Sequence, residues 1–178
     1  MEKDNHQRFI AILNNTIEPL PQSGQYLSLL ESIEDARIVM IGEATHGTQE
    51  FYQTRIEITQ QLIKDKGFMA VTIEGDWPDA HRVHRFLQAR SEDRNAAESL
   101  DDFKRFPTWM WRNTTLPPFL KWLREYNDKF SASHKVGFYG LDLYSLTTSM
   151  KAVVRYLQKV DPQAALEAKN GANNQDEK

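Results

Sequence analysis

Three short apolar runs rich in β-branched residues alternate along the chain with segments whose apolar residues recur at helical spacing. The runs cover residues 37–42, 68–73 and 136–141. Apolar runs of this length are typical of strands buried on both faces, as in a parallel sheet. A turn and a helical pattern follow each run, and three such units in series predict a parallel sheet with right-handed crossovers. The expected fold class is α/β, with strand–turn–helix units flanked by helices.

The predicted helices have recognisable ends. Apolar positions between Phe51 and Ile63 recur at helical spacing, and Gly67 supplies a stop. Pro78 suits the first turn of the next helix, where its missing N–H is not needed. A further helix is expected over about 118–130, whereas the aromatic but aperiodic residues 91–115 predict a long, packed loop.

The same pattern divides the chain into three parts. Residues 1–34 form an N-terminal helical segment, with helical stretches at 8–16 and 25–33. Residues 35–165 carry the predicted strands and their helices. Residues 166–178 are polar and unpatterned, and we expect a disordered tail there.

Composition narrows the function classes. The chain has 178 residues, 22 Lys+Arg against 25 Asp+Glu, a net charge of −3 and no Cys. This charge gives no overall attraction to nucleic acid or to an anionic membrane, and we expect neither as a partner. The missing Cys excludes a disulfide scaffold and a cysteine nucleophile. Without a long apolar span or an apolar leader, the expected location is cytoplasmic.

The candidate catalytic residues come directly after the predicted strands in the sequence. In a parallel α/β sheet, ligands bind at the carboxyl ends of the strands. The first run is followed by Glu43 and His46, the second by Glu74 and Asp76, and the third by Asp142. Helix-terminus acids alone would explain one such carboxylate. Carboxylates after all three runs, with a histidine, predict an active site at this edge.

His46 is the predicted general base, because imidazole takes up and releases protons near neutral pH. A neighbouring carboxylate would fix its tautomer and stabilise the imidazolium, and Glu43 and Glu74 are the two candidates. The alternative is a turn histidine that is bonded only to backbone.

Arg55 is predicted to lie on the inward helix face with Phe51 and Tyr52. A buried guanidinium needs an anionic partner, and Glu43 or Glu74 could provide it. The same cation could stabilise an oxyanion in the transition state. The alternative is a purely structural ion pair.

Four segments of this sequence, in order, resemble the signature of the erythromycin esterase family: residues 41–52, 73–80, 105–113 and 137–145. The resemblance implies hydrolysis of a carboxylic ester, such as a macrolide lactone, and with it a role in antibiotic resistance. It also implies that a histidine matching His46 activates water without a serine nucleophile, and that an arginine matching Arg55 belongs to the site.

The remaining predicted site residues are assigned to substrate binding: Asp76, Trp77, Trp109 and Asp142. We expect no cofactor and no metal. One alternative is metal-assisted hydrolysis, in which imidazole and carboxylates ligate a divalent ion. The ligands would be His46, Glu43, Glu74 and Asp142.

Another alternative is a truncated, inactive fragment or a binding module. The family resemblance implies a longer chain, whereas the likeness ends here near residue 165 and the sheet is expected to be incomplete. In that case the chain alone has low or no esterase activity. An uncovered sheet edge would also favour self-association.

Overall fold

A computed structural model of the chain describes residues 2–17, 20–21, 24–142 and 144–173. The chain divides into two compact units, Met1–Val39 and Met40–Lys178. The division lies five residues after the boundary expected at 34/35. The first unit contains helices α1 (Glu2–Thr16) and α2 (Leu27–Ser32), in the region where two helical stretches are expected. The second unit contains the described parts of the sheet and of the candidate site.

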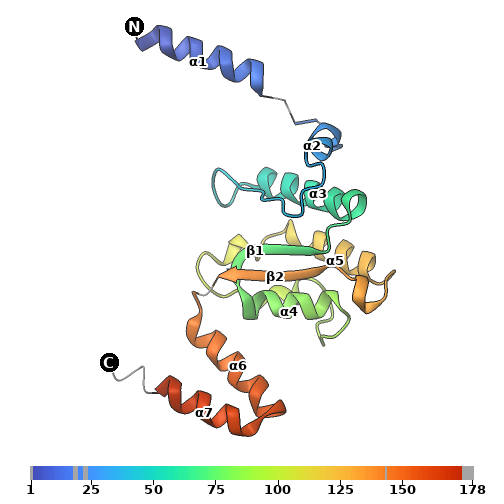
Figure 1. The fold of residues 1–178 in the computed structure, drawn as a ribbon, viewed down its shortest axis with the longest axis vertical. Coiled ribbons are helices and arrows are strands. Elements are labelled where there is room, and N and C mark those ends of the chain that lie inside the picture. The colour runs from blue at the N-terminus through green and yellow to red at the C-terminus, as the bar shows by residue number, and fades with distance from the viewer. Residues whose placement is uncertain (1, 18–19, 22–23, 143, 174–178) are drawn as a thin grey trace. The chain divides into compact units, whose positions relative to one another are not determined.

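The second unit is built around two parallel strands, β1 (Ala70–Asp76) and β2 (Gly137–Asp142). Their register pairs Ala70 with Gly137 and Asp76 with Asp142, with an irregularity between Ile73 and Asp76. Both strands point the same way, so their carboxyl ends meet at one edge (Figure 1). The second and third predicted strands and the α/β fold class are therefore confirmed.

The first predicted strand is wrong. Within the described residues the sheet has two strands, and 37–42 lies outside it without regular secondary structure. The side chains of Ile38 and Met40, expected to be buried, are 79% and 92% exposed. A strand needs a neighbour for its backbone N–H and C=O groups, and no described segment pairs with this one.

Helices α3 (Gln49–Lys66) and α4 (Trp77–Leu87) lie on opposite sides of the sheet (Figure 1). Helix α3 ends just before Gly67, as predicted, and α4 carries Pro78 in its first turn. Helix α5 (Leu116–Asn127) leads towards β2. Their apolar faces and the strands form one core, which includes Ile63, Ile73, Val83, Leu87, Leu120, Leu123 and Phe138.

The irregular segment between α4 and α5 contains two short 3-10 helices, η1 (Glu98–Leu100) and η2 (Thr108–Met110). Phe103 from this segment is buried in the core, and Trp111 packs against it. A third 3-10 helix, η3 (Ala132–His134), precedes β2. The expected packed loop is thus present, and it lies against the sheet and α3.

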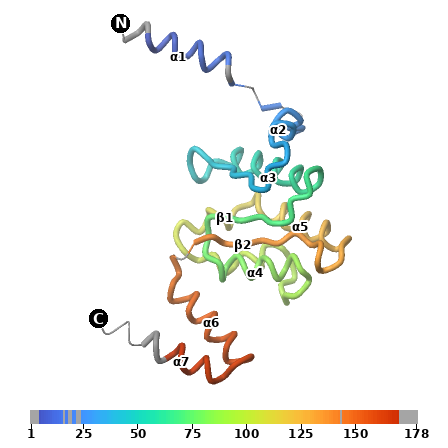
Figure 2. Tube along the Cα trace, in the orientation of Figure 1, coloured from blue at the N-terminus to red at the C-terminus, as the bar shows by residue number. Residues whose placement is uncertain are grey.

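Two helices follow β2, namely α6 (Leu146–Val160) and α7 (Pro162–Asn173), and they pack against each other. The Cα trace in Figure 2 shows them as two consecutive helices that follow the sheet. Helix α7 covers residues 166–173 of the expected disordered tail, and 174–178 lie outside the described residues. No helix in the described ranges is long and apolar enough to cross a membrane.

Candidate active site

Glu43 holds both an imidazole and a guanidinium. Its Oε1 contacts Nδ1 of His46, three residues later, and its Oε2 lies 2.6 Å from Nη2 of Arg55 on α3. The Glu43 side chain is only 12% exposed, so a nearby cation offsets the cost of burying its charge. Of the two carboxylates predicted to partner His46 and Arg55, Glu43 therefore contacts both.

Arg55 is fixed from a second side by Tyr52. The guanidinium carbon lies 4.7 Å from the centre of the Tyr52 ring, a cation–π arrangement. Burial raises the pKa of the Tyr52 hydroxyl, and the nearby Glu43 carboxylate raises it further. Tyr52 faces inward as predicted, whereas Phe51 is exposed. Arg55 and Tyr52 together anchor the otherwise irregular chain that carries Glu43.

The turn after His46 requires a glycine. Gly47 has φ +84°, a left-handed conformation that side chains with a Cβ rarely adopt. A Cβ there would lie 3.0 Å from the Trp109 ring. Trp109 therefore packs directly on the turn and does not line the cavity described next. Its position suits holding the turn in place.

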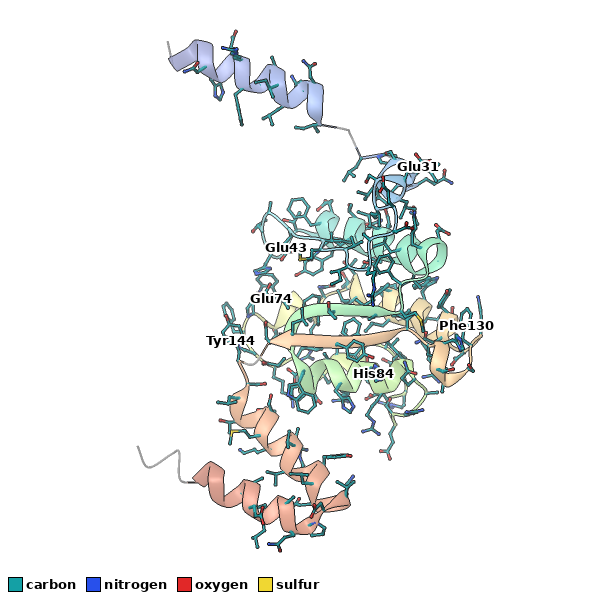
Figure 3. The ribbon with its side chains drawn as sticks, viewed as in Figure 1. Glu31, Glu43, Glu74, His84, Phe130 and Tyr144 are labelled. Atoms are coloured by element: carbon teal, nitrogen blue, oxygen red, sulfur yellow. The ribbon has the colours of Figure 1, made fainter. Side chains whose placement is uncertain are left out.

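A cavity of about 210 Å³ opens at the carboxyl ends of β1 and β2. It brings together four of the eight predicted site residues, namely His46, Glu74, Asp76 and Asp142. Figure 3 shows Glu43 and Glu74 at this edge of the sheet, with Tyr144 beyond the end of β2. The rest of the lining includes Asp79, Phe103, Arg105, Phe106, Met110, Trp111 and Tyr144.

The carboxylates of the cavity differ in environment. Asp76 is buried, and its Oδ1 accepts a hydrogen bond of 2.9 Å from the Ser145 N–H. Glu74 is exposed, and its backbone carbonyl accepts a hydrogen bond of 2.8 Å from Trp111 Nε1. Asp142, opposite Asp76 in the register, is half-buried. Asp76 thus ties the end of β1 to the start of α6.

Trp77 lies outside this cavity. It lines a second, larger hollow of about 1380 Å³ between α4, α6 and the loop 91–105. There its ring meets the edge of His81, with the ring centres 6.2 Å apart. Of the four residues assigned to substrate binding, Asp76 and Asp142 therefore lie in the cavity with His46, and Trp77 and Trp109 do not.

Sequence reasoning missed Asp79 and Arg105 as cavity residues. The pKa of Asp79 is raised to about 6, first by burial and then by the charges of Asp76 and Asp102, with Lys104 acting in the opposite direction. The Arg105 guanidinium stacks 4.0 Å from the centre of the Tyr144 ring. One sequence signal was available for Asp79: it follows Asp76 by three residues, so both lie on one face of the helix start.

The residues named for a metal site do not form one here. Within the described ranges, no three His, Asp or Glu side chains are grouped so that they could hold a metal ion. Glu43, the carboxylate in contact with His46, also pairs with the Arg55 cation. The site is thus an imidazole–carboxylate–guanidinium chain beside a cavity, at the carboxyl end of a parallel sheet.

Comparison with known proteins identifies the family. The sequence model described as erythromycin esterase matches residues 63–177, more than half of the chain. The chain therefore belongs to the erythromycin esterase family, as its motifs predict. The match includes Glu74, Asp76 and Asp142, and continues past residue 165, where the likeness was expected to end. Glu43, His46 and Arg55 precede the matched segment.

Individual relatives are distant. Erythromycin esterase type II of Escherichia coli is 26% identical over 76% of this chain and 31% of its own length. The protein YbfO of Bacillus subtilis (strain 168) is 22% identical over 77% of this chain and 29% of its own length. A crystal structure of a succinoglycan biosynthesis protein shares the fold, with TM-score 0.68, 23% identity, and coverage of 83% of this chain and 36% of that one. The chain thus spans about a third of each relative.

Proposed function

We propose that this chain hydrolyses a carboxylic ester with water activated by His46. The observation that carries the proposal is the contact chain from His46 through Glu43 to Arg55, with His46 lining the cavity at the strand ends. Membership of the erythromycin esterase family supports the same reaction class.

The contacts between His46, Glu43 and Arg55 support a different role for each residue. With Nδ1–H donated to Glu43, Nε2 is the ring nitrogen left to accept a proton from water. Glu43 holds this tautomer and stabilises the imidazolium that forms. Arg55 acts through Glu43, as a positioning residue, because it does not line the cavity.

The oxyanion of the transition state needs a cation or a donor within the cavity. Arg105 is the one Arg or Lys in the described lining. We therefore assign stabilisation of the oxyanion to Arg105 instead of Arg55, which the sequence suggested for this role. Stacking on Tyr144 restricts its orientation, which favours donation to a fixed point.

A macrolide lactone is the first ester to test, because the named Escherichia coli relative is an erythromycin esterase. If the lactone is the substrate, the reaction would contribute to antibiotic resistance. The structural neighbour, named for succinoglycan biosynthesis, makes esters of saccharides a second class for the panel. The proposal places the reaction in the cytoplasm and uses no metal.

The second candidate is a catalytically silent module that binds a partner or a second copy of itself. Exposed aromatic and apolar side chains on β2 and α6 favour it, among them Tyr139, Leu141, Val153 and Tyr156. Chromatography with light scattering would report self-association.

The deciding experiment measures hydrolysis of an ester panel by the 178-residue chain and by His46→Ala. We expect weak activity that falls by about 10²–10⁴-fold in the variant, the usual contribution of a general base. His134→Ala is the matched control, because His134 is exposed and contacts only Ser131 and Ser133 among the hydrogen bonds of the described chain. Equal activity of wild type and His46→Ala, or no hydrolysis of any ester, would contradict the proposal.

A further inference from the structure

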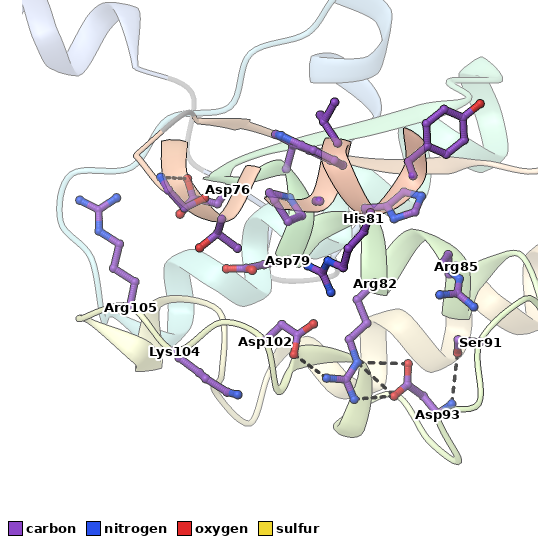
Figure 4. A pocket seen from close by; sticks show the side chains of 18 of the residues that line it. Asp76, Asp79, His81, Arg82, Arg85, Ser91, Asp93, Asp102, Lys104 and Arg105 are labelled. Atoms are coloured by element: carbon purple, nitrogen blue, oxygen red, sulfur yellow. Dashed lines mark hydrogen bonds and ion pairs between the residues drawn. The ribbon is translucent and has the colours of Figure 1, made fainter. Parts of the chain in front are cut away.

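Asp79 is shared by the small cavity and the larger hollow described above. It stands in the first turn of α4 and lines both the cavity with His46 and the larger hollow along α4 and α6 (Figure 4). In the described chain, Asp76 and Arg105 also line both. A substrate with its ester group in the small cavity and its remainder in the larger hollow therefore passes beside Asp79.

Charged and titratable groups reach these two hollows from every element around them. In the small cavity these groups are His46, Glu74, Asp76, Arg105 and Asp142. In the larger hollow they are Asp76 and Arg105 again, His81, Arg82 and Arg85 of α4, Glu92, Asp93, Asp102 and Lys104 of the following loop, and Arg155 and Lys159 of α6. Asp102 and Asp93 both pair with Arg82, at 2.7 Å. The cation that lowers the pKa of Asp79 is Lys104.

The pKa of Asp79 is raised, although its position in the first turn of α4 would by itself lower it. A carboxylate in the first turn is normally stabilised in its charged form by the positive helix N-terminus. Burial and the neighbouring Asp76 and Asp102 carboxylates nevertheless raise the Asp79 pKa to about 6. Asp79 therefore keeps a proton at a higher pH than an ordinary aspartate.

Three other carboxylates at or beside the cavity are less suited to donate a proton into it. Glu43 is engaged by His46 and Arg55, and Asp76 already accepts the Ser145 N–H. Glu74 is exposed to solvent. Among the described residues, no hydrogen bond or ion pair engages the Asp79 carboxyl, which leaves it available to a ligand.

We propose that Asp79 is the general acid that protonates the leaving alcohol when the ester bond breaks, an inference that rests on the proposed hydrolysis at His46. In the first step a water proton passes to His46 Nε2, and the hydroxide oxygen forms a bond to the ester carbonyl carbon. In the second step the bond between that carbon and the alcohol oxygen breaks, and this oxygen takes the Asp79 proton. The products are the carboxylic acid and the alcohol. His46 then releases its proton to solvent, and Asp79 regains one.

Leaving-group chemistry provides a sharp test. An ethyl ester has a poor leaving group and needs an acid, whereas a para-nitrophenyl ester leaves readily without one. In Asp79→Asn we expect kcat/KM to fall by about 10²–10⁴-fold for the ethyl ester and by less than about threefold for the para-nitrophenyl ester. The ratio of the two rates does not depend on how much of the variant is folded. Asp65→Asn, the same change on an exposed position of α3, is the control and leaves the ratio unchanged.

The pH dependence gives a second readout. In the wild type, kcat/KM for the ethyl ester falls as pH rises through about 6, because the protonated form of Asp79 is the active one. Asp79→Asn removes that fall. Equal loss of both esters, or an unchanged pH profile, overturns the role of Asp79 while hydrolysis dependent on His46 still stands. No hydrolysis of either ester by the wild type overturns the proposed function and this inference together.

Discussion

Two apolar runs with nearly the same character have different structures in this protein. Residues 68–73 overlap β1, whereas 37–42 has no regular secondary structure, and Ile38 and Met40 are exposed. The difference lies in the neighbours: β1 has β2 beside it in parallel register, and no described segment pairs with 37–42. An apolar run thus marks a segment that is able to become a strand, and pairing decides whether it does.

The candidate site joins these two regions. Asp76 and Asp142 come from the paired strands, and their positions are fixed by the ladder and the core. Glu43 and His46 come from the unpaired chain, and their positions depend on Arg55, Tyr52 and local packing. We therefore expect mutations in the strand region to change global stability, and mutations in the His46 region to change local order.

The largest expected effect on the free energy of unfolding comes from a core residue of the paired strands. Phe138 of β2 is 1% exposed, so Phe138→Ala leaves a cavity and should lower the free energy of unfolding by about 3–5 kcal/mol. Met40→Ala is the matched control in the unpaired run, with an expected change within about 0.5 kcal/mol. Urea unfolding followed by tryptophan fluorescence measures both. Similar losses in the two variants would show that Met40 is buried in solution.

A second pair of variants compares a glycine of the paired strands, Gly140, with a glycine at the end of the unpaired run, Gly42. At Gly140 of β2, an added Cβ would lie 2.3 Å from the Gly75 carbonyl oxygen and 2.7 Å from Asp76 backbone atoms. Because backbone cannot give way cheaply, Gly140→Ala should cost about 2–3 kcal/mol and push the strand ends apart. At Gly42 nothing lies within 4 Å of the added Cβ.

Gly42→Ala should therefore be close to neutral, and urea midpoints at a fixed slope separate the two cases. A neutral Gly140→Ala would mean that the strands are not closely paired at the cavity. A costly Gly42→Ala would mean that the unpaired run has a neighbour in solution.

The sequence predicts those elements whose signals are local. Helix α3 with its stop at Gly67, helix α4 with Pro78, and both paired strands lie close to their expected positions, because periodicity and capping residues act within a few positions. Helix α7 was missed because its polar residues suggested disorder, although Ala and Leu in 164–168 are strong helix formers and Ala165 is buried.

The same distinction applies to the site. The sequence left open which of Glu43 and Glu74 contacts His46 and Arg55, but the presence of such a carboxylate was predictable, because carboxylates follow the predicted strands and Arg55 lies on the inward helix face. Asp79 was not, because an acid in the first turn of a helix is ordinarily a surface residue. Part of the shift in its pKa comes from the charges of Asp102 and Lys104, which belong to a loop that is distant in sequence.

A smaller and more local effect is expected at Arg55. Arg55→Met leaves the largely buried Glu43 carboxylate without its cation, which should cost about 1–2 kcal/mol in this partly solvated setting. We expect proteolytic cleavage within 40–48 to accelerate by roughly 5–30-fold, with little change in the strands.

Arg55→Lys should restore part of this protection, since a lysine keeps the charge but lacks the planar fork. Arg90→Met, at an exposed position after α4, is the control and should leave the cleavage rate within 40–48 unchanged. Uniform acceleration across the whole second unit would show that the two regions unfold together.

The smallest expected effect on the free energy of unfolding is at Asp79, and there we expect the substitution to stabilise the protein. Its pKa is about 6 in the folded protein, above the ordinary aspartate value, so the folded state binds the proton more tightly than the unfolded state. Stability is therefore greatest below about pH 4 for this group, falls as pH rises from about 4 to about 6, and stays lower above that. Asn cannot ionise, so Asp79→Asn removes this loss.

Because the Asp79 side chain is half-buried and still reached by solvent, screening reduces the gain to about 1 kcal/mol or less. Thermal unfolding of wild type and Asp79→Asn at pH 4 and pH 7.5 tests this, with Asp65→Asn as the control. We expect the two proteins to differ little at pH 4 and Asp79→Asn to be the more stable at pH 7.5. A variant that is less stable at pH 7.5 would show that the Asp79 carboxylate supports the start of α4. A more stable variant that loses hydrolysis of the ethyl ester would show that the fold carries this buried acid at a cost to its own stability.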